Sequence, residues 1–558
     1  MKKLPIGVSD FKTILNDCYY YVDKTLLIKE LIESSGLVIL IPRPRRFGKT
    51  LNLSMLKYFF EKTDEDNSVL FKDTAIWQNR DYRKFQGQYP VIFLTFKDIK
   101  EENWEITYIK IVSLVAQAFS HHFDAIEKVI LSSEINEYIA IMGKKADEAT
   151  YHNSLFFLSR LLYRAYNKKV VILIDEYDAC IHAGYNNNYY NTATHFMRSV
   201  LTSVLKDNKY LERGILTGIL RTAKEGIFSG LNNLKVCSLL DYSFQDKFGF
   251  TQPEVENLLT HYNLLESFED VQKWYNGYIV GNATIYNPWS LLMYADQKGK
   301  LQPYWLNTSD NQIIKKLLVL ADAQLKADLE LLLSNGTVTK VVDEAIVFSD
   351  IENNSDAIWS LLLFAGYLTY SKYVLERGKI YCDLKIPNEE IKFLYEGFIE
   401  DIFNRTLKTA KVDLFLNSLI TGDVQTFSEL LQEFILNSMS IYDLPNDEPE
   451  KSYHLFVLGL LVFLADSYQI KSNRESGYGR YDIMLIPHDK NKLGLVIEFK
   501  KVLIDRKETL DSAAEKALEQ IRNKHYAQEL KSLGIRRIKA LGIAFQGKQI
   551  LVVSKDII

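Results

Sequence analysis

The chain of 558 residues lacks the features that mark membrane, secreted and fibrous proteins. Its longest apolar run, 455–465, is about half of the roughly 20 residues that a membrane-spanning helix needs, and the N-terminus has no apolar signal-peptide core. The four cysteines are far apart and form no Cys-x-x-Cys pair, which argues against a zinc site or a disulfide framework. Repeats and low-complexity segments are absent from the sequence as well. These absences predict a globular cytoplasmic protein with no membrane partner.

Net charge is small, but it is unevenly spread. The whole chain carries −4, whereas residues 451–558 hold 19 Lys and Arg against 12 Asp and Glu. A basic C-terminal segment on an acidic body indicates a polyanionic partner, and DNA is expected more than RNA. A chance fluctuation of surface charge is the alternative. The length suggests about three or four domains.

The first motif that carries chemistry joins a short apolar run, 37–42, to Gly48-Lys49-Thr50 and a helical segment, 51–60. Strand, turn and a helix that starts at Gly-Lys-Thr are typical of a phosphate-binding P-loop, in which backbone N–H groups and the helix dipole face the phosphates. Lys49 is expected to reach the β- and γ-phosphates of ATP, and the Thr50 hydroxyl to bind Mg²⁺. A helix start without a ligand is the alternative.

The loop departs from the usual P-loop pattern at its first position. Arg43 stands where a glycine is common, and a side chain there restricts the backbone of the turn. Two more arginines, Arg45 and Arg46, precede Phe47. They could add positive charge near a nucleotide or hold the loop through carboxylates. Arg46 and Phe47 are counted with the three residues that follow as the predicted nucleotide-binding loop.

An aliphatic run, 170–174, ends in Asp175 and Glu176 and predicts a strand buried on both faces of a parallel sheet. Acids at the carboxyl end of such a strand lie at the ligand edge of α/β proteins. Asp175 is expected to hold Mg²⁺, and Glu176 to orient or deprotonate an attacking water. The alternative to a magnesium site is a strand followed by a helix whose N-cap is one of these acids, since Asp is favoured at N-caps. The order of the two motifs favours a nucleotide site.

Two further candidates follow a third apolar run, 214–220. Thr217 lies where P-loop ATPases often have a polar residue near the γ-phosphate, and Arg221 could stabilise charge in the transition state. A surface salt bridge is the alternative for Arg221. Downstream, the aromatic stretches 274–278 and 286–290 indicate tight packing turns, with a nucleic-acid stacking surface as the alternative. Residues 301–440 are predicted to be mainly helical.

The C-terminal segment holds a second constellation, on a hairpin whose turn spans 487–492. Asp482 and Glu498 are equally far from residue 490, inside the turn, so without a bulge they oppose each other on one face, and Lys500 shares that face. Opposed carboxylates favour Mg²⁺ or Mn²⁺, and Lys500 could hold the attacking water or the scissile phosphate. This Asp-turn-Glu-x-Lys arrangement is the PD-(D/E)xK nuclease pattern, and an ordinary cross-strand charge pair is the alternative. Gln520, on a predicted helix at 512–530, matches a frequent extra motif of that superfamily.

Both ends of the chain resemble one bacterial and archaeal family, the AAA-ATPase-like proteins with a C-terminal PD-(D/E)xK nuclease-like domain. The matching stretches are Pro5–Gly7, Tyr21–Thr25, Arg43–Thr50, Leu173–Asp178, Trp274–Tyr278, Gly477–Asp482 and Glu498–Lys500. The resemblance implies an α/β chain in three parts: an ATPase domain of the AAA type at 1–295 with a parallel sheet, a helical connector at 296–445, and a restriction-endonuclease-like domain at 446–558.

These observations predict a P-loop ATPase coupled to a Mg²⁺-dependent nuclease that acts on DNA, in defence or mobile-element biology. ATP and Mg²⁺ are the expected cofactors, and Mn²⁺ could replace Mg²⁺ at the nuclease site. The alternative is a nucleotide-switched regulatory or assembly protein whose nuclease-like domain binds nucleic acid without cutting it. Whether the chain self-associates is left open.

Overall fold

The computed structural model divides into two compact units, Met1–Ile313 with Thr339–Ile391, and Ile314–Val338 with Lys392–Ile558. The three-part division expected from the sequence stays a prediction. None of the described helices is long and apolar enough to cross a bilayer. The described residues are 1–220, 232–305, 328–329, 331–333, 335–345, 355–396, 409–438, 457, 460–461, 464, 467–476, 479–502 and 508–557.

A five-stranded parallel sheet forms the centre of the first unit, in the order β2-β3-β4-β1-β5. Its inner strands β1 and β3 are aliphatic runs buried along their whole length, as expected for strands covered on both faces. The predicted α/β class is confirmed. The strands are β1 (Val38–Pro42), β2 (Val91–Thr95), β3 (Val170–Asp175), β4 (Leu211–Gly218) and β5 (Leu234–Val236).

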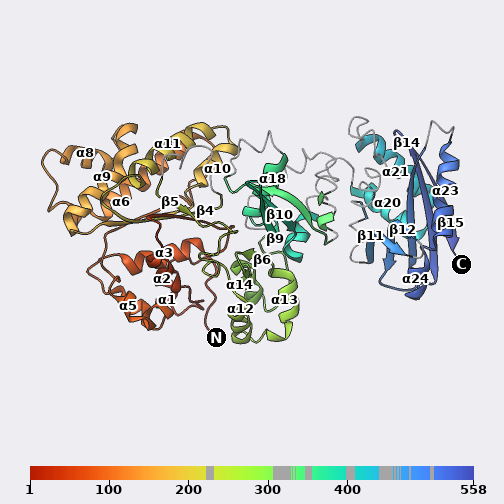
Figure 1. Cartoon of the computed structure of the whole chain (residues 1–558), viewed down its shortest axis with the longest axis horizontal. Coiled ribbons are helices and arrows are strands. Elements are labelled where there is room, and N and C mark those ends of the chain that lie inside the picture. Colours follow the sequence, from red (N-terminus) through yellow and green to blue (C-terminus); the bar gives the residue numbers. More distant parts are fainter. Residues whose placement is uncertain are drawn as a thin grey trace. The chain divides into compact units, whose positions relative to one another are not determined.

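Helices cover both faces of this sheet (Figure 1). Helix α3, which follows β1 directly, lies on one face with α1 and α2, whereas α6, α8, α9 and α11 lie on the other. The helices up to residue 205 are α1 (Phe11–Asn16), α2 (Leu26–Glu33), α3 (Lys49–Phe60), η1 (Asn67–Phe71), α4 (Ala75–Gln78), α5 (Arg80–Arg83), α6 (Trp104–His121), α7 (Phe123–Ile126), α8 (Ile135–Met142), α9 (Glu148–Tyr166), α10 (Ala179–Asn186) and α11 (Tyr190–Leu205).

The two long helices begin where their sequences supply a cap. The side chain of Asn103 accepts a hydrogen bond from Ile106 N at the start of α6, and that of Asp147 accepts one from Thr150 N at the start of α9. Buried side chains recur at helical spacing along both helices and pack with the strands in one hydrophobic core. The chain between β2 and β3 is thus mostly helical.

The remainder of the first unit combines helices with short sheets. A two-stranded hairpin pairs β6 with β7, and a second sheet has the order β8-β10-β9. The sequence predicted mainly helix at 301–440 and missed this second sheet, although α18, in the same range, is a helix. The elements are α12 (Gln252–His261), η2 (Leu265–Ser267), α13 (Phe268–Tyr275), β6 (Tyr278–Val280), β7 (Ala283–Ile285), α14 (Pro288–Asp296), β8 (Val338–Val342), α18 (Ser355–Phe364), β9 (Thr369–Glu376) and β10 (Lys379–Lys385).

A buried carboxylate joins the aromatic stretches to the segment after β10. Glu390 is 1% exposed, and its oxygens accept hydrogen bonds from Ser290 Oγ at 2.8 and 3.0 Å and from Trp305 N at 2.8 Å. Nearby, Gly277 has φ +96° and lies so close to the chain that an added Cβ would be 2.1 Å from the carbonyl oxygen of Pro387. The two aromatic stretches therefore serve packing, as expected from the sequence.

A five-stranded mixed sheet forms the second unit, in the order β11-β12-β13-β14-β15, and only the β13–β14 pair is parallel. The predicted helix at 512–530 is two helices, because the chain turns between them with His525 at φ +55°. Strand β11 was not predicted. The elements are α20 (Thr409–Thr421), α21 (Val424–Ser438), β11 (Tyr468–Ser476), β12 (Gly479–Pro487), β13 (Leu493–Lys501), α23 (Leu510–Asn523), α24 (Gln528–Ser532), β14 (Arg537–Gln546) and β15 (Gln549–Ile557).

Substitution of Glu390 by glutamine should remove a pH dependence of stability. Burial raises the pKa of Glu390 from 4.5 to about 7, so the folded state holds a proton that the unfolded state releases. The stabilisation from this group is complete below pH 4.5 and is lost as pH rises through 7, by at most about 3 kcal/mol. Thermal melts of wild type and Glu390→Gln should therefore match near pH 5, with the variant more stable at pH 8. Parallel melting curves across this range would contradict the assignment.

Candidate nucleotide and nuclease sites

The carboxyl ends of β2, β3 and β4 meet at one edge of the first sheet, and Asp175 lies at the centre of that edge. Its Oδ2 accepts hydrogen bonds from Thr50 Oγ1 at 2.7 Å and Thr95 Oγ1 at 3.2 Å, and its Oδ1 accepts one from Thr217 Oγ1 at 2.8 Å. Asp175 is fully buried. Carboxylate and hydroxyl oxygens are the ligands that Mg²⁺ prefers, so this set fits the ion that the motifs imply. The fold brings together three residues that the sequence singled out.

The turn between β1 and α3 has the shape of a phosphate-binding loop. Gly48, the N-cap of α3, has φ +81°, a conformation that glycine adopts without strain. Among the described residues, no acceptor takes the backbone N–H groups of residues 48–50. These donors lie at the positive end of the helix dipole, so they suit an anionic ligand.

Lys49 is turned into the loop that precedes it. Its Nζ donates hydrogen bonds to the carbonyl oxygens of Arg43 at 2.9 Å and Pro44 at 3.0 Å, and the residue is 4% exposed. Burial lowers the pKa of Lys49, and the carboxylates of Glu176 and Asp178 act in the opposite direction. The ammonium group is thus held by weak neutral acceptors, which the oxygens of a phosphate would replace with stronger, charged ones.

The other predicted residues of this site lie around the same edge. Glu176 follows β3 with φ +49°, and its carboxylate lies 3.7 Å from Lys100 Nζ. Arg46 is exposed and stacks on Trp289, whereas the Phe47 ring is buried. Arg221 lies outside the described residues.

Arg43 explains the departure from the usual P-loop pattern. Its side chain is fully buried, and its guanidinium donates hydrogen bonds to the carbonyl oxygens of Pro42, Cys237, Ser238 and Phe244 at 2.8 to 3.3 Å. Burial lowers the pKa of Arg43 to about 10. The arginine is therefore an internal anchor of the loop, and it ties the end of β1 to the chain between β5 and α12.

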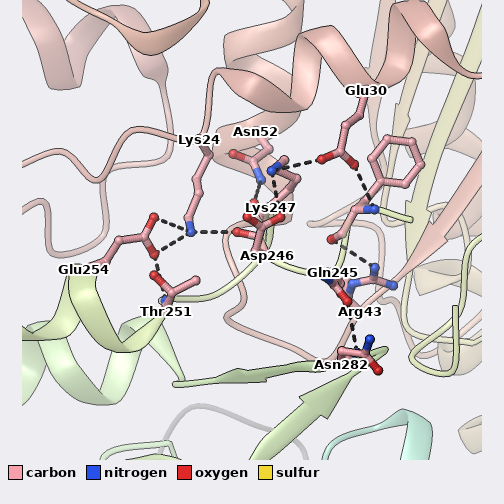
Figure 2. A network of polar contacts seen from close by, with 11 residues as sticks. Lys24, Glu30, Arg43, Asn52, Gln245, Asp246, Lys247, Thr251, Glu254 and Asn282 are labelled. Atoms are coloured by element: carbon pink, nitrogen blue, oxygen red, sulfur yellow. Dashed lines mark hydrogen bonds and ion pairs between the residues drawn. The ribbon is translucent and has the colours of Figure 1, made fainter. Parts of the chain in front are cut away.

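A polar network continues from this anchor (Figure 2). Glu30 of α2 accepts a hydrogen bond from Phe244 N at 3.0 Å and forms an ion pair with Lys247 Nζ, also at 3.0 Å. Lys24, 8% exposed, bonds both carboxylate oxygens of Glu254, at 2.6 and 2.7 Å. Asn52 of α3 donates to the carbonyl oxygen of Lys247 at 2.9 Å. The network fixes the N-terminal segment, the P-loop helix and residues 244–254 as one scaffold.

Three residues at the nucleotide edge were missed by the sequence analysis. Thr95 ends β2, and the meeting of parallel strand ends at one edge could have pointed to it. Asp178 is 1% exposed and accepts hydrogen bonds from the backbone N–H groups of residues 219 and 220, which fix the end of β4. Lys100 reaches Glu176 from the loop after β2, and no sequence signal marks it.

The second site lies where β12 and β13 separate. The register pairs Ile483 with Ile497, which places Asp482 and Glu498 one step beyond the last paired residues, at the positions that the hairpin predicts. Asp482 Oδ2 accepts a hydrogen bond from Phe499 N at 2.8 Å. Lys500 Nζ lies 3.4 Å from Glu498 Oε1.

Glu498 is the most constrained member of this site. It is 2% exposed, its Oε1 accepts a hydrogen bond from Gln520 Nε2, and its Oε2 is buried with no hydrogen-bond partner among the described residues. Gln520 Nε2 also donates to Tyr526 Oη at 3.3 Å. Burial and the charge of Asp482 raise the pKa of Glu498, whereas Lys500 acts against this rise. Two close carboxylates, one of them with an unpaired oxygen, are the donor set that a divalent cation would satisfy.

No cluster of three His, Cys, Asp or Glu that could hold a metal is present in the described ranges. Among the described residues, the pair Asp482 and Glu498 is therefore what this site offers an ion. Mg²⁺ commonly binds through one or two carboxylates and keeps several waters, so a two-carboxylate site fits it. Lys500, on the same strand, adds one positive charge beside the pair.

The two folds and their sites define a P-loop ATPase-like domain and a PD-(D/E)XK nuclease-superfamily domain in one chain. Residues 5–228 match the family model described as a predicted AAA-ATPase, and residues 448–555 match that of the PD-(D/E)XK nuclease superfamily. The resemblance drawn from the motifs is thus confirmed at both ends. A relative from Azotobacter chroococcum mcd 1, described as an uncharacterized protein in the vnfD 5′ region, is 26% identical over 550 residues, covering 98% of this chain and 96% of its own.

Replacement of Arg43 by leucine should destabilise the first unit by about 2 kcal/mol or more, because four buried carbonyl groups lose their donor. Arg45→Leu, two residues further on, is the matched control, since the Arg45 side chain is partly exposed, and its effect should stay within about 0.5 kcal/mol. Urea unfolding followed by tryptophan fluorescence measures both. Equal stability of the two variants would show that Arg43 is no anchor.

Proposed function

We propose that the chain is an ATP-binding and ATP-hydrolysing protein whose C-terminal domain is a Mg²⁺-dependent nuclease acting on DNA, in a defence or mobile-element setting. The observation that carries the proposal is the convergence of Asp482, Glu498 and Lys500 on one end of a buried hairpin. The basic C-terminal segment favours a nucleic acid as the substrate. The Asp175 edge supplies the nucleotide site.

At the nucleotide edge, each residue has a distinct task. The N–H groups of residues 48–50 bind the phosphate oxygens, and Lys49 leaves its carbonyl partners to bind the terminal ones. Thr50 and Asp175 hold Mg²⁺, which neutralises phosphate charge when bound. Glu176 orients the attacking water and accepts its proton. Thr95 and Thr217 keep the Asp175 carboxylate in one orientation.

At the nuclease site, Asp482 and Glu498 bind the divalent ion, which lowers the pKa of bound water and stabilises phosphate charge when present. Gln520 holds Glu498 in place through Oε1 and leaves Oε2 directed to the ion. Lys500 binds the scissile phosphate or the attacking water. The water oxygen attacks phosphorus and gives its proton to solvent water, the bond from phosphorus to the departing oxygen breaks, and that oxygen takes a proton from solvent water.

ATP binding and ATP hydrolysis should be separable by substitution. Lys49→Ala should weaken binding of a fluorescent ATP analogue at least about 10-fold, because the phosphates lose a direct cation. Glu176→Gln should keep binding but lower the hydrolysis rate about 100-fold or more. Lys57→Ala, on the same helix, is the matched control and should behave as wild type. Wild-type affinity in Lys49→Ala would place the nucleotide elsewhere.

DNA cleavage should depend on the C-terminal triad. Asp482→Ala and Lys500→Ala should each lower Mg²⁺- or Mn²⁺-dependent cleavage about 100-fold or more, because one removes a metal ligand and the other a cation at the phosphate. Lys501→Ala is the matched control for Lys500, since its side chain is exposed, and it should cut normally. Circular dichroism checks folding, and EDTA should abolish cleavage. Full activity in both folded variants refutes the nuclease assignment.

The regulatory alternative gains support from the small number of ligands at this site, since the described residues give the pair no third carboxylate. The same assays separate the two functions. Wild-type protein that binds DNA or RNA but cuts neither, with Mg²⁺ or with Mn²⁺, would favour a nucleotide-switched binding module over the nuclease.

A further inference from the structure

The P-loop is held from outside by four downstream residues, two of them in the aromatic stretches, and neither site gives these residues a role. Every loop residue from 44 to 47 meets a different downstream residue. Pro44 lies against Gly366, Arg45 O accepts a hydrogen bond from Trp305 Nε1 at 3.3 Å, the Arg46 guanidinium lies 4.4 Å from the Trp289 ring centre, and Phe47 meets Tyr278 edge to face at 5.0 Å.

Arg46 differs from its neighbours in this set, because its side chain is exposed and its backbone is strained. Its φ is +68°, a left-handed conformation that a residue with a Cβ adopts at an energetic cost. Strain of this kind persists where the surroundings fix the residue. The guanidinium stacks on Trp289, and a cation over an indole face is the strongest of the cation–π pairs.

Trp289 is itself fixed before it meets the arginine. It follows Pro288, the first residue of α14, and its N–H donates to the Oδ1 of the N-cap residue Asn287 at 2.9 Å. Its indole Nε1 donates to the carbonyl oxygen of Tyr304 at 3.3 Å. These two hydrogen bonds fix the indole ring of Trp289, and one face of the ring lies against Arg46 of the P-loop.

The charge of Glu176 also acts on Arg46. Burial lowers the pKa of Arg46, the Glu176 carboxylate acts to raise it, and Arg45 acts to lower it. The guanidinium is therefore within the field of the carboxylate that follows β3. A planar, delocalised cation at this place suits the oxygens of a terminal phosphate.

We infer that Trp289 is a positioning residue of the nucleotide site, which holds Arg46 through its ring face so that the guanidinium meets the terminal phosphate of ATP. The inference rests on the proposed ATP site and adds a role for the downstream aromatic stretch. This contact should increase the affinity for ATP but not the affinity for ADP, which lacks the terminal phosphate.

Equilibrium titrations of the full chain with fluorescent ATP and ADP analogues test the inference. Trp289→Ala should raise the Kd for ATP about 2- to 5-fold, the range expected for one exposed cation–π contact, and leave the Kd for ADP within about 2-fold. Trp289→Phe keeps a ring face but loses the indole N–H, so it should restore most of the ATP affinity. Trp274→Ala, a partly exposed tryptophan on the same segment, is the control and should match wild type.

A double-mutant cycle gives the decisive readout. With Arg46→Ala already present, Trp289→Ala should cause no further loss of ATP affinity, because the two residues act as one unit. Additive losses, or a Trp289→Phe variant no better than Trp289→Ala, would overturn the positioning role and assign Trp289 to structure alone. Failure of the ATP site itself gives a different result, since wild type and Lys49→Ala would then bind ATP equally.

Discussion

A fully buried guanidinium at the end of β1 is the constraint on which the nucleotide half of the molecule depends. A charge buried this deeply costs several kcal/mol unless its donors find acceptors, and the two terminal nitrogens of Arg43 donate to the carbonyl oxygen of Pro42 and to three more at 237–244. Those carbonyl groups cannot move apart without leaving the charge exposed to an apolar interior. The arginine thus gives the loop a fixed base, whereas glycine at this position would give it freedom.

The C-terminal site also contains a buried charged group, but of the opposite sign. At Glu498 the protein places a carboxylate in a buried position, next to a second carboxylate, and leaves one oxygen without a partner. An unpaired acceptor in a low-dielectric setting is destabilising, and a divalent cation relieves it directly. Both terminal nitrogens of Arg43 have carbonyl acceptors within the fold, and its Nε is buried with no partner among the described residues, so its role is structural. The unpaired atom of Glu498 instead belongs to a carboxylate next to a second carboxylate, and this like-charge pair is the physical reason to propose Glu498 as a ligand.

Sequence patterns predicted the strands and the hairpin register, which depend on residues close together in the chain. They missed side-chain pairs that form between segments far apart in the chain. The strands β1, β3 and β4 are aliphatic runs, and the hairpin register that brings Asp482 to Glu498 follows from counting back from one turn. Nothing local marks Lys100 as a partner of Glu176, or Trp289 as a partner of Arg46, because these pairs are set by how separate segments pack. Strand β11 was missed because its sequence, largely polar, has little of the apolar alternation that marks a strand. The sheet β8-β10-β9 was missed because β9 and β10 are half exposed, and their alternation is weak.

The loop between β1 and α3 is thus held by contacts of Arg43 and of residues 44–47, and the ammonium group of Lys49 is buried inside it. Lys49 makes two hydrogen bonds to neutral carbonyl groups, so its ammonium group is not left unsatisfied when no nucleotide is bound. Phosphate oxygens carry charge, and bonds to charged acceptors are about twice as strong as bonds to neutral ones. Exchange of the two carbonyl partners for phosphates is therefore favourable without any movement of Arg43 or of the scaffold behind it. A nucleotide bound here would thus be taken up by a side-chain exchange, and the strained Arg46, at the exposed turn of the same loop, would then meet the terminal phosphate.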